Sequence, residues 1–222
     1  MEKIINITLD GPGGSGKTTM AKKLAVHYGI AYLDTGAMYR GIACFLRDKK
    51  IDFNDTDSIK NILPKIKMEI KLDNDTQQVY VNNKNYTKLL RDHEISNGAS
   101  IVSAIPEVRL KLVDIQRQIA RDNSVVADGR DMGSYVLPDA EFKFYLNADV
   151  EVRAKRRFLE LKLKNQEISM EKVKQDMIER DERDSSRAFA PLVVPKGAYV
   201  IDTTNLNIDE VMEILINKID DK

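Results

Sequence analysis

Histidine, cysteine and tryptophan are nearly absent from this sequence of 222 residues, which has two histidines, one cysteine and no tryptophan. His27 lies late in a predicted helix and His93 in a polar segment, so neither is placed as a general base and no metal-ligand spacing exists. Cys44 has no partner for an internal disulfide, and its apolar neighbours indicate a buried thiol. The sequence therefore argues against a zinc site, a disulfide-stapled fold and histidine-based catalysis, and it suits a reducing cytoplasm.

An excess of charge and long apolar runs are also missing. Thirty-five basic residues balance thirty-five acidic ones, so the chain has no overall electrostatic attraction to nucleic acid or to an anionic membrane. No apolar run approaches the roughly 18 residues of a membrane-spanning helix, and the N-terminus leads directly into a predicted strand. We therefore expect a soluble cytoplasmic protein without nucleic-acid or membrane partners, built as one α/β domain with a small insertion.

A glycine-rich segment is the most informative stretch that the sequence does contain. Gly11 is followed after four residues by Gly16-Lys17-Thr18, which fits the phosphate-binding P-loop pattern. Glycines let successive backbone N–H groups surround a phosphate chain, the lysine neutralises the outer phosphates, and the threonine hydroxyl can hold Mg²⁺. The residues predicted to bind the phosphates of ATP are Gly11, Pro12, Gly13, Gly14, Ser15, Gly16, Lys17, Thr18 and Thr19.

The neighbours of this segment favour a P-loop over a glycine-rich turn without a ligand. Residues 4–9 are β-branched and mostly apolar, as expected of a strand that is buried on both faces. A helix is predicted from Thr18 or Thr19 to Gly29, and its positive dipole end would face the phosphates. The segment therefore lies between a strand and a helix, which is the context that a P-loop requires.

Strand and helix patterns alternate along the chain and predict a five-stranded parallel sheet with helices on both faces. The other strands are expected at 31–34, 124–127, 142–146 and 198–201, and the other helices after Thr35, around 59–66, from Pro106, over 149–187 and after Asn207. Residues 67–72 and 79–81 instead alternate polar and apolar side chains around the turn-like residues 73–75, which predicts an antiparallel hairpin. We therefore assign residues from about 64 to 90 to an inserted subdomain.

Six arginines lie in the helical stretch 149–187, where the simplest interpretation is a solvated face paired with acidic neighbours. Their spacing favours a binding role for some of them. Arg180, Asp184 and Arg187 occur at i, i+4 and i+7, so they would share one side of a helix, where they could grip a polyanion and a sugar. Arg153 and Arg157 are also four residues apart.

A second group of candidates follows the predicted strands 31–34 and 124–127 or, in the case of Arg109, lies on the predicted helix that begins at Pro106. Its members are Thr35, Tyr39, Arg40, Arg109, Arg130 and Asp131. For Tyr39, core packing is an equally good interpretation. A phosphate that accepts a phosphoryl group is mostly dianionic at pH 7, so it needs positioning and charge neutralisation more than a base. A kinase acting on such an acceptor can dispense with histidine.

Several motifs together resemble the cytidylate kinase family of nucleoside monophosphate kinases, and the resemblance covers almost the whole chain. The motifs are Asp10–Lys17, Leu33–Arg40, Asn97–Ser100, Ala127–Gly133, Arg180–Asp184 and Arg187–Leu192. The run Asp128–Gly133 is the most specific of them. The alternating strands at 67–81 also match the insertion that this family carries in its monophosphate-binding region. Thr35 stands where many members have serine, which keeps the hydroxyl but leaves its contact open.

The resemblance implies a role for each candidate. A cytosine base would be read by Ser100, Arg109 and Asp131, and the sugar would be held by Tyr39, Arg180 and Asp184. The acceptor phosphate would be clamped by Arg40 and Arg130 and bridged to the donor by Arg187. Thr35 is included among the substrate-binding residues. The implied catalytic residues are Lys17, Arg130, Arg187, Arg153 and Arg157, of which the last two belong to a lid over ATP.

The resemblance also implies an organisation and a reaction. It implies one P-loop kinase domain over 1–222, with a monophosphate-binding region at 35–105 and a short helical lid at 153–187. The reaction would be ATP + (d)CMP = ADP + (d)CDP, with Mg²⁺ held by Thr18 and with the chain acting as a monomer.

Two other interpretations fit parts of the sequence. Another small-molecule P-loop kinase, for UMP or shikimate, is the alternative within enzymes, and a hydroxyl acceptor would need a base that Asp34 could supply. A nucleotide-gated binding protein without turnover is the alternative outside enzymes. Such a switch would not need the second set of arginines, which counts against it.

Overall fold

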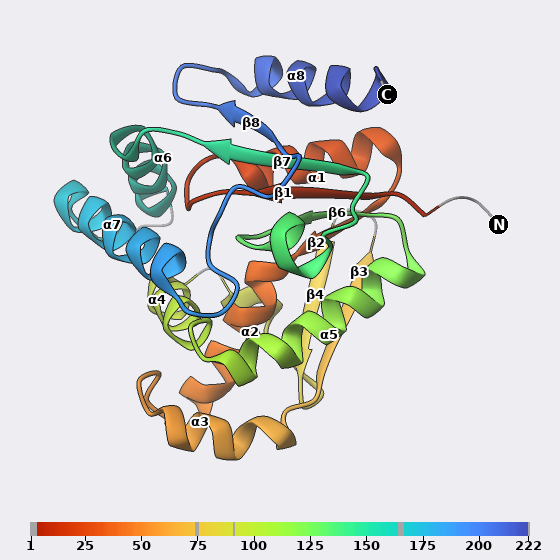
Figure 1. The fold of residues 1–222 in the computed structure, drawn as a ribbon. Coiled ribbons are helices and arrows are strands. Elements are labelled where there is room, and N and C mark those ends of the chain that lie inside the picture. Colours follow the sequence, from red (N-terminus) through yellow and green to blue (C-terminus); the bar gives the residue numbers. More distant parts are fainter. Residues whose placement is uncertain (1–3, 74–75, 91, 164–166, 222) are drawn as a thin grey trace.

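The computed structural model describes residues 4–73, 76–90, 92–163 and 167–221, and it places them in two β-sheets with helices packed around them (Figure 1). The larger sheet has five strands in the order β2-β6-β1-β7-β8, all parallel, and the smaller has three antiparallel strands in the order β3-β4-β5. The predicted α/β class, parallel sheet and antiparallel insertion are thus confirmed.

The parallel sheet is buried between two hydrophobic cores. Its strands are β1 (Asn6–Asp10), β2 (Ala31–Asp34), β6 (Val125–Asp128), β7 (Phe142–Asn147) and β8 (Tyr199–Asp202). Successive side chains of a strand point to opposite faces, and accordingly Leu33 packs in one core while Tyr32 packs in the other. The strand expected at 4–9 begins only at Asn6, since Ile4 and Ile5 are exposed.

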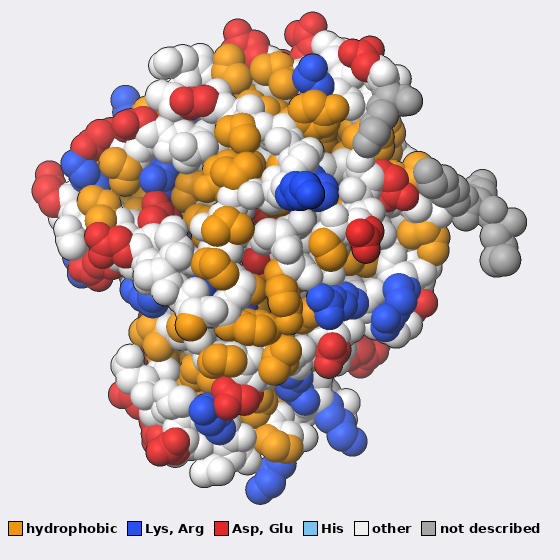
Figure 2. Space-filling view, viewed as in Figure 1, with side chains coloured by type: hydrophobic (Ala, Val, Ile, Leu, Met, Phe, Trp, Pro, Cys, Tyr) orange, Lys and Arg blue, Asp and Glu red, His pale blue; other side chains and the backbone are white. Residues whose placement is uncertain are grey.

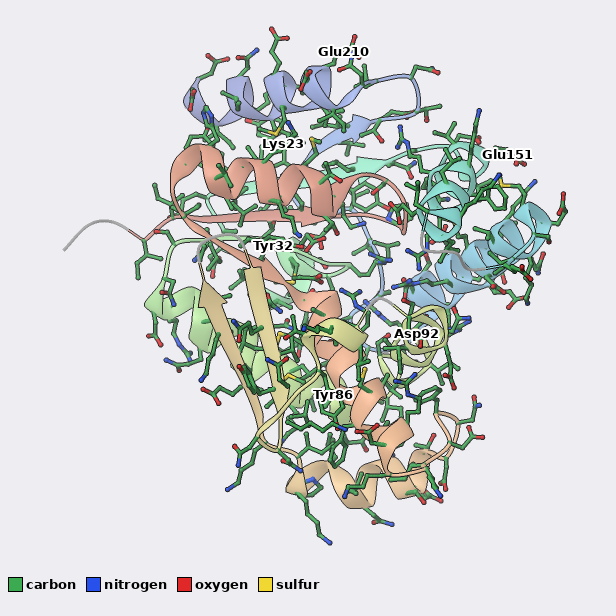
Figure 3. All side chains as sticks on the ribbon, turned by 180° about the vertical axis from the view of Figure 1, so that it is seen from behind. Lys23, Tyr32, Tyr86, Asp92, Glu151 and Glu210 are labelled. Carbon is green, nitrogen blue, oxygen red and sulfur yellow. The ribbon has the colours of Figure 1, made fainter. Side chains whose placement is uncertain are left out.

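Helices cover both faces of this sheet. One face carries α1 (Lys17–Tyr28) and α8 (Ile208–Asp220), and Figure 3 shows these two helices side by side, with Lys23 on the first and Glu210 on the second. The other face carries α2 (Thr35–Asp48) and α5 (Pro106–Asp122). α1 begins at Lys17, slightly earlier than expected, and ends as predicted at Gly29, whose φ of 63° lies in the left-handed region.

The insertion forms a small sheet of its own. Its strands are β3 (Met68–Asp73), β4 (Thr76–Val81) and β5 (Lys84–Asn85), and they are preceded by α3 (Thr56–Ile62) and the short 3₁₀ turn Leu63–Lys65. The hairpin is confirmed, although residues 74 and 75 of its predicted turn lie outside the described ranges. The third strand was not predicted, because its two residues are too few for a pattern. Asn82 and Asn83 make the turn into it at positive φ.

Two hydrogen bonds between a side chain of the insertion and the backbone of β2 attach the insertion to the edge of the parallel sheet. The backbone N–H of Asp34 donates to Gln77 Oε1 at 2.8 Å, and Gln77 Nε2 donates to the carbonyl of Asp34 at 2.9 Å. The amide of Gln77 therefore imitates a strand neighbour at the end of β2. The insertion also packs on α2, where a Cβ added to Gly41 would lie 2.7 Å from Val79 Cγ1.

Three helices complete the chain and correct the expectations. α4 (His93–Val102) was missed because its polar start and glycine conceal an apolar face of Ile95, Ala99 and Val102. The helical stretch 149–187 divides into α6 (Val150–Lys162) and α7 (Met170–Ser186). Arg187 follows the end of α7 with extended backbone angles, so the predicted stripe of Arg180, Asp184 and Arg187 on one helix was wrong in its last member.

The outer surface carries both kinds of charge. On the face drawn in Figure 2, blue and red side chains are interspersed with hydrophobic ones, without a single broad basic area. Within the part of the chain that the structure describes, we find no helix with the length and apolar character that crossing a membrane demands.

The start of α8 provides a test of the fold. Asn207 accepts hydrogen bonds from the N–H groups of Asp209 and Glu210, and the Glu210 side chain accepts one from the N–H of Asn207. Because this capping box satisfies otherwise unpaired N–H groups, we expect Asn207→Ala to lower the free energy of unfolding by about 0.5–2 kcal/mol in urea titrations. Asn217→Ala, on the exposed side of the same helix, is the control and should change it little; equal losses would contradict the capping role.

Candidate active site

The P-loop is shaped by glycines that no other residue could replace without strain. Gly11, Gly14 and Gly16 have φ values of 140°, 75° and 92°. A Cβ added to Gly11 would lie 2.0 Å from the carbonyl oxygen of Leu146 on β7. The loop therefore depends both on left-handed backbone angles and on a close approach between neighbouring strands.

Lys17 is buried, with a relative exposure of 5%, so its ammonium group is largely removed from water. Its Nζ donates to the carbonyl of Pro12 at 2.6 Å and to Ser15 Oγ at 3.3 Å. Burial, followed by the nearby charge of Arg130, lowers the pKa of Lys17 well below its usual value. A phosphate anion within the loop would raise the pKa of Lys17 again, because its negative charge offsets both the burial and the charge of Arg130.

Asp128 is a site residue that the candidate set omitted. It is buried at the end of β6, and its two carboxylate oxygens accept hydrogen bonds from Thr18 Oγ1 at 2.7 Å and from the Tyr32 hydroxyl at 2.9 Å. Figure 3 shows Tyr32 where the two sheets meet. Burial, with the nearby charge of Asp34, raises the pKa of Asp128. Its place in the most specific motif was the signal that could have identified it.

A hydroxyl and a carboxylate are the oxygen donors that Mg²⁺ prefers, so Thr18 and Asp128 fit such an ion. Among the described residues, no group of three or more histidine, cysteine, aspartate or glutamate side chains could hold a metal by itself. Mg²⁺ commonly keeps waters and shares phosphate oxygens with its substrate, so a small protein contribution is compatible with it.

A buried ion pair lies on the other side of the site. Arg109 donates from Nη2 to Asp131, and its side chain is only 1% exposed. Arg187 Nη2 lies 3.5 Å from the other carboxylate oxygen of Asp131. The guanidinium of Arg109 lies over the ring of Tyr39, at 5.4 Å from its centroid. Tyr39 therefore belongs to the core, as one of its two interpretations predicted, and it also contacts the guanidinium of Arg109.

Asp184 is the centre of a second charge cluster. Its carboxylate accepts a hydrogen bond from Arg130 Nε at 2.8 Å and lies 3.8 Å from Arg180 Nε and 3.6 Å from Arg187 Nη1. Burial alone would raise the pKa of Asp184, but the three positive charges outweigh it and the pKa is lowered. Burial, reinforced by Arg130, lowers the pKa of Arg180 to about 10. The single negative charge of Asp184 therefore faces three guanidinium groups, so positive charge remains in excess around it.

Arg187 reaches this cluster from outside the helix. Its Nε donates to the carbonyl of Ala190 at 2.6 Å, and Ala190 has a positive φ of 48°. The following turn is fixed by the N–H of Leu192, which donates to the carbonyl of Asp184 at 2.8 Å. Arg187 therefore lies between Asp131 and Asp184 because of a turn, which the spacing of charged residues did not predict.

The remaining candidates lie around these clusters. Arg40 pairs with Asp34 at 2.7 Å, and the hydroxyl of Thr35 donates to the carbonyl of Asp128 at 2.8 Å. Ser100 Oγ accepts from Arg183 Nη1 at 2.8 Å. Arg183 was not among the candidates, because its helical position gave no sign that it would reach α4.

Arg153 and Arg157 differ in their surroundings. Arg153 is buried and donates to the carbonyls of Ala148 and Gly13 and, at 2.6 Å, to Asp181. It therefore restrains the P-loop from outside. Arg157 is partly exposed and pairs with Glu160 at 3.1 Å.

Several guanidinium groups in this region retain unused donors. Within the described ranges, the buried atoms Arg40 Nε, Arg109 Nε, Arg180 Nε and Arg187 Nη2 have no hydrogen-bond partner. Buried donors of this kind are rare and costly in proteins. Because they come from α2, α5, α7 and the turn after α7, they favour a ligand with several acceptor oxygens between these elements.

The two halves of the site adjoin each other. A Cβ added to Gly13 would lie 3.5 Å from Arg130 Nη2, so this arginine reaches the P-loop while it pairs with Asp184. A phosphate in the P-loop and an anion at the arginine cluster would therefore be neighbours, and both would be neutralised by Arg130. This geometry suits transfer between two anionic groups.

Asp34 is not available as a general base in this arrangement. Its Oδ1 accepts from the N–H of Ala37 at 2.8 Å, which caps α2, and its Oδ2 accepts from Arg40. A carboxylate that is both a helix cap and an ion-pair partner has little capacity to take a proton from a substrate hydroxyl.

Comparisons with known proteins agree with this geometry. The profile described as cytidylate kinase matches residues 7–221. The chain is 45% identical over 211 residues to a cytidylate kinase of Caldicellulosiruptor saccharolyticus, covering 95% of this chain and 93% of that protein. It is 46% identical over 209 residues to a cytidylate kinase of Caldanaerobacter subterraneus, covering 94% and 92%. An uncharacterized protein of Eubacterium ventriosum shares the fold, with a TM-score of 0.55, 15% identity, and coverage of 98% of this chain and 99% of that one.

The charge balance at Asp184 predicts how stability responds to acid. Because its pKa is lowered in the folded state, the ionised carboxylate stabilises the fold above its usual pKa near 3.8, and this contribution is lost as the pH falls through the folded value. We expect Asp184→Asn to be less stable than the wild type by about 3 kcal/mol at pH 7, and this difference should shrink below about pH 4.

Urea unfolding of both proteins between pH 3 and pH 7 would measure this difference. Asp114→Asn, on the exposed side of α5, is the control and should follow the wild type at each pH. A difference for Asp184→Asn that stayed constant with pH would show that its carboxylate is not stabilised by the arginines.

Proposed function

This chain belongs to the cytidylate kinase family and is a nucleoside monophosphate kinase, and we propose that the charge clusters around Asp131 and Asp184 bind the acceptor nucleotide while the P-loop binds ATP. It phosphorylates CMP and dCMP in the reaction ATP + (d)CMP = ADP + (d)CDP. The observation that carries the assignment of these clusters is the buried Arg109–Asp131 pair, which presents a carboxylate beside unused guanidinium donors.

Base recognition follows from the chemistry of this pair. An ionised carboxylate accepts hydrogen bonds but cannot donate, and the exocyclic amine of cytosine is a donor where uracil has an acceptor oxygen. Asp131 therefore favours CMP over UMP. Arg109 orients the carboxylate of Asp131, and Ser100, held by Arg183, contributes a hydroxyl on the same side.

The sugar and the acceptor phosphate bind around Asp184. Asp184 and Arg180 hold the sugar with the help of Tyr39, while Thr35 lines the same side. Arg40 and Arg130 hold the acceptor phosphate, and Arg187 lies between the acceptor and the donor. The unused N–H groups of Arg40, Arg180 and Arg187 support these assignments, because phosphate and sugar oxygens would satisfy them.

The donor phosphates bind in the P-loop, over residues 11–19. Lys17 leaves its contacts with Pro12 and Ser15 to neutralise the outer phosphates. Mg²⁺ would be held by Thr18 and Asp128, and when bound it supplies positive charge to the phosphate oxygens. Catalysis by the chain itself is electrostatic: Lys17, Arg130 and Arg187 stabilise the charge shared by donor and acceptor.

The regions 35–105 and 153–187 act as a monophosphate-binding region and a lid within one domain over 1–222. Arg153 and Arg157 belong to the lid, and the contacts of Arg153 with Gly13 and Asp181 support this placement because they join α6, α7 and the P-loop. Closure of the lid excludes water that would otherwise hydrolyse ATP. The protein acts in the cytoplasm as a monomer, without a nucleic-acid or membrane partner.

A coupled ADP-release assay separates this proposal from its alternatives. The substrates are CMP, dCMP, UMP, AMP, GMP and shikimate. Turnover with CMP and dCMP well above the rest is expected. Preferential turnover with shikimate would favour a hydroxyl acceptor, and a flat response would favour a nucleotide-gated switch.

Base discrimination should depend on Asp131. Asp131→Asn keeps the shape of the side chain but can turn an amide N–H toward the uracil oxygen, so we expect the CMP-to-UMP ratio of kcat/KM to fall roughly tenfold to hundredfold. Measurement of kcat/KM for both substrates tests this.

The control for this measurement is Asp139→Asn, an exposed aspartate in the loop before β7, which should keep the wild-type ratio. An unchanged ratio in Asp131→Asn would mean that Asp131 does not read the base.

Lys17 should matter for turnover more than for folding. Methionine is of similar length and apolar, so Lys17→Met relieves the burial of a cation while it removes the charge that the phosphates need. We expect kcat to fall by at least about a hundredfold, with a melting temperature close to that of the wild type. Lys23→Met, on the outer side of α1 facing α8 (Figure 3), should leave kcat unchanged. Near-normal turnover by a folded Lys17→Met protein would contradict the P-loop assignment.

A further inference from the structure

Asp10 is a fully buried carboxylate at the end of β1. It takes no part in the proposed binding of ATP, of the acceptor nucleotide or of Mg²⁺. Its two oxygens accept hydrogen bonds from the backbone N–H groups of Met132 and Gly133, each at 2.7 Å. Burial raises the pKa of Asp10 to about 7, while the two amides act in the opposite direction. Removing a carboxylate from water costs folding free energy, so a buried carboxylate that is retained indicates a role for the contacts that it makes.

The two amides belong to the first turn of a short π-helix, Met132–Val136, and Asp131 occupies the capping position before it. An aspartate at that position ordinarily accepts from the N–H of the second or third residue of its own helix, and the second is Gly133 here. Asp131 makes no such bond, because its carboxylate faces Arg109 and Arg187 instead. Asp10 accepts from the amides that Asp131 leaves unpaired.

Asp10 also precedes Gly11, the first glycine of the P-loop. One residue therefore joins the strand that carries the phosphate loop to the segment that carries Arg130 and Asp131. The segment is held from its other side as well, since Arg117 donates to the carbonyls of Tyr135 and Val136.

We propose that Asp10 is a positioning residue for base selection: it caps the turn at Met132–Val136 from a neighbouring strand and so keeps the Asp131 carboxylate directed at the base. Without Asp10, the carboxylate of Asp131, which occupies the capping position, can turn back to accept from the turn. Turning back to do so would take it away from Arg109 and from the substrate. This proposal rests on the assignment of Asp131 as the residue that reads the base.

Asp10→Asn tests the proposal, because the amide group can accept only one of the two N–H bonds and sets a donor against the other. We expect the CMP-to-UMP ratio of kcat/KM to fall roughly fivefold or more, with a rise in the KM for CMP and little change in the KM for ATP. Hydrogen–deuterium exchange in the segment 129–137 without nucleotide should become faster. The exchange measurement does not depend on the substrate.

A double mutant decides whether Asp10 acts through Asp131. If it does, Asp10→Asn combined with Asp131→Asn should show the same CMP-to-UMP ratio as Asp131→Asn alone. Independent, additive effects on the ratio would overturn the proposal. Leu215→Ala is the control for general destabilisation, because it removes core volume beneath α8, on the opposite face of the sheet, and should lower the melting temperature without changing the ratio.

Gly133→Ala provides a second route if Asp10→Asn does not fold. Its Cβ would lie 2.8 Å from Thr8 Oγ1 and 3.1 Å from Pro195 Cγ, so it displaces the amide of residue 133 while Asp10 remains. The same fall in the ratio is expected. Equal losses of kcat/KM for CMP and UMP in both variants would show a merely structural role and overturn the proposal. An unchanged ratio in Asp131→Asn would instead count against the proposed function.

Discussion

Buried charge at the carboxyl edge of the parallel sheet is the constraint on which the rest of this structure depends. Asp10, Asp128 and Asp131 end or follow two neighbouring strands, and all three carboxylates are removed from water. Such groups are tolerated only when each has partners. Arginines pair with Asp131, backbone amides of the turn after it donate to Asp10, and the hydroxyls of Thr18 and Tyr32 donate to Asp128. The elements around the edge are therefore fixed by the need to compensate charge as much as by apolar packing.

Much of the fold could be predicted from sequence because its signals are local. Apolar strands and helix caps identified the five parallel strands, which the structure confirms, and the glycine spacing identified a loop between β1 and α1, three of whose glycines have left-handed backbone angles. The failures have different causes: the polar start of α4 concealed its apolar face, the turn after α7 that carries Arg187 has no recognisable local signal, and the contact of Arg183 with Ser100 joins residues distant in sequence. The burial of Lys17 likewise comes from tertiary packing, which a motif does not contain. The sequence could therefore nominate candidate residues, but it could not predict the contacts that these residues make.

The arrangement of charges also distinguishes the kinds of acceptor that the family's fold could serve. A hydroxyl acceptor requires a free base, and Asp34 is engaged by the N-terminus of α2 and by Arg40. A phosphate acceptor requires cations with unused donors, and the described arginines around Asp184 retain several. Because positive charge exceeds negative charge there, an incoming dianion would complete the balance rather than disturb it.

The bridge between Gln77 and Asp34 has a consequence for solubility. β2 is an edge strand of the parallel sheet, and exposed edges are templates on which a second chain can add a strand. The glutamine amide occupies the backbone N–H and C=O of Asp34, and the strands of the insertion lie alongside (Figure 1). The insertion therefore blocks the pairing of β2 with a strand of another molecule. Shortening the insertion would expose an aggregation-prone edge strand even if the nucleotide site were left intact.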